Sequence, residues 1–146
     1  MAASHDLTVR VRWSEADPAG IVFYPRFYEW FDLATEALFD SLGLPWPVIF
    51  PQYRIVGVPI VECGARFAAP VRYGDRVHIR SAVTDVAART FRVAHEVGVG
   101  ATECASGFEV RAWVAVPDAP GGRLRSRPLP DEIARRLLGE PAAGRA

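Results

Sequence analysis

The 146-residue chain contains no lysine: all 17 of its basic residues are arginine. This absence excludes Schiff-base chemistry and the lysine of a Walker-type phosphate loop. Arginine remains, and its planar guanidinium suits phosphate and carboxylate groups. The 17 acidic residues balance the arginines to a formal net charge of zero, which argues against a nucleic-acid partner.

Cysteine and long hydrophobic runs are also scarce. Cys63 and Cys104 are too few for a disulfide scaffold, and neither they nor the three histidines have metal-ligand spacing. No segment approaches about 18 uninterrupted apolar residues, and the N-terminal segment turns polar too soon for a signal peptide. We therefore expect a cytoplasmic protein with no metal site and no membrane partner.

What is present is typical of one globular domain. Half of the residues are hydrophobic and 23% are charged, a balance that permits a single core in a chain of this length. We expect the domain to span residues 1–138. Residues 139–146 are expected to form a disordered tail.

One long helix is predicted over residues 25–42. Pro25 suits its first position, and Gly43 suits the position just after its end. Apolar residues recur at spacings of three and four and form one stripe: Phe27, Trp30, Phe31, Ala34, Leu38 and Leu42. Before the helix, residues 7–14 alternate in polarity as a half-buried strand does. After it, three prolines in residues 44–53 predict a loop with at most one irregular helical turn.

Four further strands are predicted from alternating Val, Ile and Phe residues, at 55–68, 76–87, 90–99 and 102–116. Short connections imply that consecutive strands are antiparallel neighbours. A short helix is expected over residues 130–138. Because the long helix must bury its stripe on one face of the sheet, we predict an α+β hotdog fold, in which a curved antiparallel sheet of about five strands wraps one long helix.

The segment between the first strand and the long helix is the candidate site. Asp17 lies in an Asp-Pro-Ala-Gly turn that ends at Gly20, and the helix begins at Pro25. Unpaired N–H groups at a helix start can hold the oxyanion formed in acyl transfer, and a nearby carboxylate can attack or activate water. The alternative is that Asp17 only bonds its own backbone, as is common in such turns.

Other charged residues have two interpretations each. Glu29, Asp32 and Glu36 lie on the polar side of the helix, where solvated carboxylates are expected. Five late arginines cluster around turns and could hold phosphate, although scattered surface arginines would look the same: Arg89, Arg92, Arg123, Arg125 and Arg127.

The run from Asp17 to Asp32 (DPAGIVFYPRFYEWFD) resembles the signature of hotdog-fold acyl-CoA thioesterases, in particular the aspartate-type 4-hydroxybenzoyl-CoA thioesterase family. The likeness continues through residues 55–63 (IVGVPIVEC) and residues 73–75, and it fades after about residue 116. The resemblance implies that Asp17 is the nucleophile or general base. It also implies that the backbone N–H of Tyr24 polarises the thioester carbonyl, while Gly20 and Ile21 shape the loop.

The family pattern further implies a site at a subunit interface, in a homodimer that commonly doubles to a tetramer. The segment Val58, Pro59 and Ile60 would then contact substrate from the partner chain. Phe23 would suit a flat ring, and Asp32 matches the position near the far end of the aryl group.

The coenzyme A nucleotide is expected near Arg89, Thr90 and Arg125. Ala87 and Ala88 stand where close relatives tend to have basic residues, and Val58 replaces a hydroxyl-bearing residue. The contacts to the nucleotide and the identity of the acyl group can therefore differ from those of the family. No cofactor is expected, since coenzyme A arrives as part of the substrate.

The resulting hypothesis is an acyl-CoA thioesterase that hydrolyses an aromatic CoA thioester in aromatic degradation. The substrate would be 4-hydroxybenzoyl-CoA or a relative such as benzoyl-CoA or aminobenzoyl-CoA. Two alternatives are a thioesterase for short aliphatic acyl-CoAs and a hotdog protein that binds acyl-CoA without turnover. An enoyl-CoA hydratase is disfavoured, because no Asp–His pair has the usual loop spacing.

Overall fold

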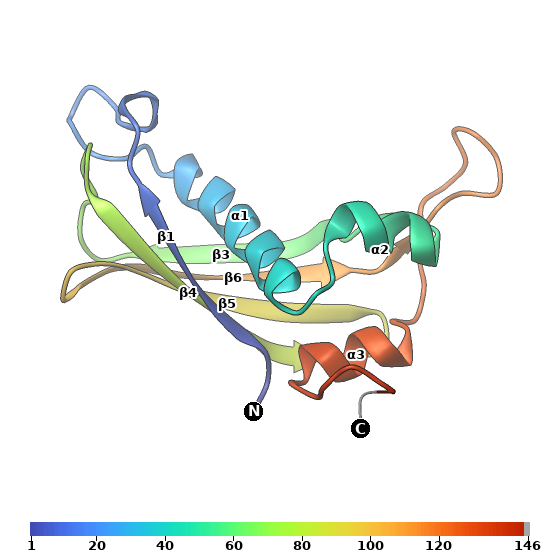
Figure 1. Cartoon of the computed structure of the whole chain (residues 1–146). Helices are drawn as coiled ribbons and strands as arrows, with labels where there is room; N and C mark the ends of the chain where they lie inside the picture. The colour runs from blue at the N-terminus through green and yellow to red at the C-terminus, as the bar shows by residue number, and fades with distance from the viewer. Residues whose placement is uncertain (145–146) are drawn as a thin grey trace.

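The computed structural model describes residues 1–144. Its main sheet has five strands in the order β1-β4-β5-β6-β3, and every neighbouring pair is antiparallel. The strands are β1 (Ser4–Arg10), β3 (Ile60–Phe67), β4 (Arg76–Val86), β5 (Thr90–Val99) and β6 (Thr102–Ala112). Figure 1 shows this sheet curving around one long helix, as predicted.

The long helix, α1 (Pro25–Ser41), lies against one face of the sheet (Figure 1). Most of its predicted stripe is buried, since Phe27, Trp30, Phe31, Ala34 and Leu38 are all at most 4% exposed. Leu42, the last predicted member, follows the end of the helix and is half-buried. Along β4 the residues facing α1 are buried and most of those between them face solvent, the period of two expected of a sheet covered on one side. The layer order is therefore helix on sheet.

A glycine allows the closest approach between helix and sheet. A Cβ atom added at Gly107 of β6 would lie 2.5 Å from the ring of Phe31, which packs directly on the strand. The same ring stacks on His95 of β5, with centroids 4.7 Å apart. A side chain at residue 107 would push α1 away from the sheet.

The predicted strand 55–68 is wrong as a single element. It is divided into β2 (Ile55–Gly57) and β3, with Val58 and Pro59 between them. Pro59 has no N–H to donate to a ladder, so pairing is interrupted there. Strand β2 instead joins a small sheet, β2-β7-β8, with β7 (Val114–Ala115) and β8 (Arg125–Ser126). The predicted strand 102–116 is divided as well, into β6 and β7, at Trp113, whose amide donates to the Arg89 carbonyl.

The predicted order of neighbours is also wrong for β3. It pairs with β6 at the far edge of the sheet, whereas β1 pairs along β4 from Ser4 with Ala82 to Arg10 with Arg76. Strand β4 therefore pairs with β1 on one side and with β5 on the other. The local pattern identifies β3 as a strand but contains nothing that selects its partner.

Two further elements differ from prediction. The first strand ends at Arg10, and Trp13–Glu15 forms a short 3₁₀ helix because Glu15 accepts a hydrogen bond from the Arg12 amide. The proline-rich segment contains an eight-residue helix, α2 (Trp46–Tyr53), which tolerates Pro47 in its first turn. The C-terminal helix α3 (Asp131–Leu137) falls within its predicted range.

Residues 139–144 contain no helix or strand, and residues 145–146 lie outside the described residues, so the disordered tail stays a prediction. Among residues 1–144, no helix is long and apolar enough to cross a bilayer.

Candidate active site

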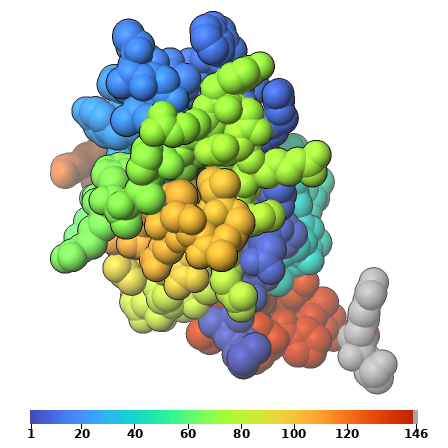
Figure 2. Space-filling model, turned by 90° about the vertical axis from the view of Figure 1, so that its left-hand side faces the viewer, coloured from blue at the N-terminus to red at the C-terminus, as the bar shows by residue number. Residues whose placement is uncertain are grey.

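The loop formed by residues 11–24, hereafter the Asp17 loop, lies at one end of the molecule. It closes on itself through an isolated bridge between Ala16 and Val22, in which the Asp17 amide donates to the Ile21 carbonyl over 2.8 Å. A second bridge joins Ile21 to Arg72, in the connection between β3 and β4. Figure 2 shows the two segments side by side on this face, residues 11–24 in blue and the connection in yellow-green.

Within the loop, the predicted turn at Asp17 is present. Asp17 Oδ1 accepts a hydrogen bond from the Ala19 amide over 2.9 Å, and the Gly20 amide donates to the Asp17 carbonyl. Gly20 has φ +79°, a left-handed conformation that favours glycine. The second carboxylate oxygen, Oδ2, has no hydrogen-bond partner among residues 1–144. Asp17 therefore bonds its own backbone through one carboxylate oxygen, and the other oxygen is left without a partner among these residues.

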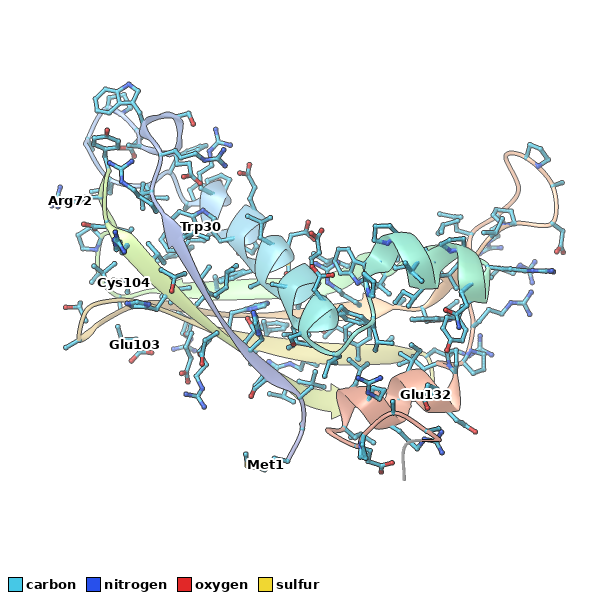
Figure 3. All side chains as sticks on the ribbon, in the orientation of Figure 1. Met1, Trp30, Arg72, Glu103, Cys104 and Glu132 are labelled. Atoms are coloured by element: carbon cyan, nitrogen blue, oxygen red, sulfur yellow. The ribbon has the colours of Figure 1, made fainter. Side chains whose placement is uncertain are left out.

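A buried carboxylate that the sequence did not indicate as a site residue, Glu15, anchors this loop to the core. Glu15 is 3% exposed, and it accepts a hydrogen bond from Trp30 Nε1 over 2.7 Å and another from the Arg12 amide. Trp30, labelled in Figure 3, projects from α1 at this end of the helix. The Glu15 carbonyl also accepts from the Phe23 amide. Glu15 thus ties the loop to α1 before Asp17 and joins it to Phe23 after Asp17.

The start of α1 leaves one main-chain donor free. Pro25 has no N–H, and the amides of Arg26 and Phe27 donate to the carbonyls of Phe23 and Tyr24. The amide of Tyr24 has no acceptor among residues 1–144. A free N–H at a helix start carries partial positive charge and can hold an oxyanion.

An apolar pocket of about 370 Å³ opens beside this amide. The predicted residues Ile21 and Tyr24 line it, together with Phe27, whereas Phe23 is exposed and packs edge-on against the Tyr24 ring. The opposite wall consists of residues 67–71. The sequence did not predict it, because these residues end a strand and begin an irregular connection, and neither has a recognisable pattern. Asp17 and Gly20 do not line this cavity, which is of a size that can hold an acyl group.

Val58, Pro59 and Ile60 do not join this pocket within one chain. They precede and begin β3, whereas Phe67, which lines the pocket, ends it. Six strand residues, 61–66, thus separate Ile60 from Phe67. Ile60 is 41% exposed on the edge strand.

The predicted nucleotide residues lie at the Val58 end of the molecule, opposite the Asp17 loop (Figure 1). A hollow of about 1010 Å³ follows β7 and β8, hereafter the arginine hollow, and four arginines line it: Arg89, Arg123, Arg125 and Arg127. Arg89 is held in place by the Ser126 carbonyl, 2.7 Å from Nη1. Thr90 follows Arg89 without lining the hollow, and Arg92 lies instead over the Phe108 ring.

Asp32 is not simply a solvated helix residue. Its Oδ1 accepts a hydrogen bond from Arg111 Nη2 over 2.6 Å, and Arg111 Nε donates to Glu109 Oε2 over 2.8 Å. Burial alone raises the pKa of Glu109, but the adjacent His95 ring and Arg111 guanidinium lower it to about 2. Burial lowers the pKa of Arg111, yet its bonds to Glu109 and Asp32 outweigh this and raise it. Glu109 and Arg111 were not predicted as functional; charged residues in the interior of an apolar strand were the available signal.

Among residues 1–144, no group of three or more His, Cys, Asp or Glu side chains is placed to hold a metal ion. The predicted lack of a cofactor stays a prediction.

Comparison with known proteins agrees with this geometry. Residues 11–137 match the model of the thioesterase-like superfamily. The chain belongs to this superfamily. It is 35% identical to 4-hydroxybenzoyl-CoA thioesterase of Pseudomonas sp. (strain CBS-3) over 98 residues, 66% of this chain and 70% of that protein. It is 28% identical to 1,4-dihydroxy-2-naphthoyl-CoA hydrolase of Synechococcus sp. (strain WH7803) over 127 residues, 77% and 83% of the two chains.

A crystal structure of a D17N mutant of 4-hydroxybenzoyl-CoA thioesterase, complexed with 4-hydroxybenzoyl-CoA, superposes with a TM-score of 0.85 and 28% identity. The match covers 93% of this chain and 99% of that one. These findings confirm the predicted hotdog fold and the predicted enzyme class, an acyl-CoA thioesterase.

Proposed function

We propose that this enzyme hydrolyses an aromatic acyl-CoA, 4-hydroxybenzoyl-CoA or a near relative, with Asp17 as the nucleophile or general base. The observation that carries the proposal is one cluster at the Asp17 loop. It combines a carboxylate oxygen without a partner, a free helix-start amide and an apolar pocket beside that amide. These are the parts that hydrolysis of a thioester requires.

The chemistry follows one of two routes. In the first, Asp17 Oδ2 attacks the thioester carbonyl carbon, the C–S bond breaks, and the coenzyme A thiolate leaves an acyl-aspartyl anhydride that water hydrolyses. In the second, Asp17 accepts a proton from water as the water attacks. In both, the Tyr24 N–H stabilises the negative charge that develops on the carbonyl oxygen.

A homodimer would complete the site. Strand β3 is an edge strand whose residues are exposed or half-buried, and Val61 at 61% and Phe67 at 49% exposure offer apolar surface to a partner. An unprotected edge of this kind pairs with another strand. If two copies pair antiparallel through β3, the strand direction reverses, so the partner's segment of residues 58–60 comes to lie at this chain's Phe67 and its pocket. Further doubling to a tetramer is part of the proposal.

The same two-fold operation supports a nucleotide site shared between subunits. The arginine hollow and the residue 58–60 segment lie at the same end of one chain, because β2, β7 and β8 form one small sheet. The partner's hollow would therefore approach this chain's Asp17 loop. Coenzyme A carries phosphates, and arginines bind phosphate in bidentate geometry. We assign Arg89 and Arg125 to this contact, with Thr90 beside them.

The aromatic acyl group is supported by the two relatives, a 4-hydroxybenzoyl-CoA thioesterase and a 1,4-dihydroxy-2-naphthoyl-CoA hydrolase. The pocket suits a flat ring, because Phe27 and Phe67 line it with ring centroids 5.0 Å apart. Such an enzyme would act in the cytoplasm in the degradation of aromatic compounds.

The test is release of free thiol from 4-hydroxybenzoyl-, benzoyl- and acetyl-CoA by the wild type and the Asp17→Asn variant. We expect rapid release from an aryl substrate and a loss of at least ~100-fold in the variant, the scale of a positioned nucleophile or base. The thermal stability of the variant is expected to match the wild type, since asparagine can still accept the Ala19 hydrogen bond through its side-chain oxygen.

Each contrary result selects an alternative. A loss of less than tenfold removes Asp17 from the mechanism. Turnover of acetyl-CoA alone indicates an aliphatic thioesterase, and stabilisation by acyl-CoA without any thiol release indicates a binding protein. Single turnover in ¹⁸O-labelled water tests the anhydride route: attack of water on the aspartyl carbonyl of the anhydride places the label in the Asp17 carboxylate, which direct attack of water on the thioester never does.

A further inference from the structure

Glu15 is a buried carboxylate that the reaction described above does not use. It is 3% exposed, and both of its side-chain oxygens accept hydrogen bonds from neutral donors. The Arg12 amide donates to Oε1 over 2.7 Å, and Trp30 Nε1 donates to Oε2 over 2.7 Å. The Arg12 guanidinium adds only an exposed contact, with Nε 3.6 Å from Oε1. Burying a carboxylate on two neutral donors costs more than burying an apolar side chain would, so its presence calls for an explanation other than stability.

The main chain of Glu15 joins the two halves of the Asp17 loop. Its carbonyl accepts a hydrogen bond from the Phe23 amide over 3.0 Å, and two residues later the Asp17 amide donates to the Ile21 carbonyl over 2.8 Å. These bonds make a short antiparallel ribbon. Asp17 belongs to one strand of this ribbon, and Tyr24, which has the free amide, directly follows the other. The ribbon therefore determines how the carboxylate lies relative to that amide.

The hydrogen bond from Trp30 fixes this ribbon on α1. Trp30 is 2% exposed, and its ring packs edge-on against Phe27, with centroids 5.0 Å apart. Phe27 in turn lines the apolar pocket. A second contact between loop and helix, from Arg26 Nη2 to the Ser14 carbonyl, is exposed and 3.5 Å long. The buried bond between Glu15 and Trp30 therefore fixes the ribbon relative to the helix and the pocket wall.

We propose that Glu15 is a positioning residue for thioester hydrolysis, whose buried carboxylate holds Asp17 in place against the Tyr24 amide. The inference rests on the proposed function, in which Asp17 attacks the thioester or activates water. A small displacement of a reacting group slows a reaction far more than it weakens binding of the substrate. Glutamine has the same shape as glutamate but only one acceptor oxygen. In Glu15→Gln the side-chain amide must therefore face the Arg12 amide or Trp30 Nε1, donor against donor, and the ribbon shifts.

The test is steady-state thiol release from 4-hydroxybenzoyl-CoA, with kcat and KM measured separately. We expect Glu15→Gln to lower kcat by about 10- to 100-fold and to leave KM within about twofold, because the substrate still binds but the attacking group is misplaced. Glu15→Asp keeps both acceptor oxygens on a side chain one methylene shorter, so it should recover part of the lost kcat. Glu96→Gln makes the same chemical change at an exposed position of β5 and should leave both constants unchanged.

A double variant tests whether Glu15 acts through Asp17. Added to Asp17→Asn, Glu15→Gln should lower the residual rate by less than about threefold, because the carboxylate that Glu15 positions is already gone. If Glu15→Gln slows the wild type and the Asp17→Asn enzyme by the same factor, Glu15 acts independently of Asp17 and the positioning role is wrong.

The outcomes separate the inference from the function on which it rests. If the wild type hydrolyses no aryl substrate, or if Asp17→Asn keeps the full rate, the proposed function fails. If Asp17→Asn is inactive while Glu15→Gln keeps the wild-type kcat or changes KM alone, the function stands and the inference is overturned. Should Glu15→Gln fail to fold in a melting experiment, Glu15→Asp takes its place, and a wild-type kcat in that variant overturns the proposal.

Discussion

The Asp17 loop and the Glu109–Arg111 cluster both hold carboxylates in place, but by opposite means. The loop is held mostly by main-chain hydrogen bonds between residues close in sequence, such as the Asp17 amide with the Ile21 carbonyl. The cluster is held by side chains far apart in sequence, as in the 2.8 Å bond between Thr35 and Glu109. Asp17 is half-exposed, whereas Glu109 is buried.

This difference implies different consequences of mutation. A side chain in a loop fixed by its main chain can be changed without releasing the loop, so Asp17 is free to serve chemistry. In the cluster each side chain is the partner of another, so one change leaves a buried group uncompensated. The loop should therefore respond in rate and the cluster in stability.

The largest effect on folding is expected for Glu109. Glu109→Ala should lower the free energy of unfolding by about 3–5 kcal/mol, because it leaves the Arg111 charge buried without its main partner. Urea unfolding measures this directly. Glu103→Ala, an exposed position on the same strand, is the control and should stay within about 0.5 kcal/mol of wild type. Equal effects at the two positions would show that the buried contacts of Glu109 stabilise the fold no more than an exposed side chain does.

The pH dependence of stability should show that the charge of Glu109 stabilises the cluster. The folded-state pKa of Glu109, about 2, lies below its ordinary value of 4.5, so its contribution is fully present above pH 4.5 and is lost as the pH falls toward 2. By pH 3 the wild type should have lost about 2 kcal/mol of this contribution, which Glu109→Gln lacks at any pH. The gap in unfolding free energy between the two proteins should therefore narrow from pH 6 to pH 3. A constant gap would show that Glu109 contributes through its shape and not its charge.

The same contrast explains which parts of the fold and of the site could be predicted from the sequence. The helix over residues 25–42, the turn at Asp17 and the free helix start depend on neighbours within a few residues, and all of them are present. The pairing of β3 with β6 and the bond between Thr35 and Glu109 join residues at least 38 positions apart, which no local pattern specifies. The four-arginine hollow lies between these cases: its members cluster in sequence, but only the fold brings Arg89 to them.

The smallest expected effect tests whether the loop depends on its backbone alone. A Cβ atom at Gly20 would meet no other atom within 4 Å, so Gly20→Ala introduces no clash and only the strain of a left-handed φ of +79°. We expect it to lower the free energy of unfolding by about 1 kcal/mol. Gly20→Asn should be milder, because asparagine tolerates this conformation. If Gly20→Ala also slows thiol release while Gly20→Asn does not, the turn conformation itself positions Asp17. If both variants slow it equally, a side chain at residue 20 obstructs the substrate and the backbone argument is wrong.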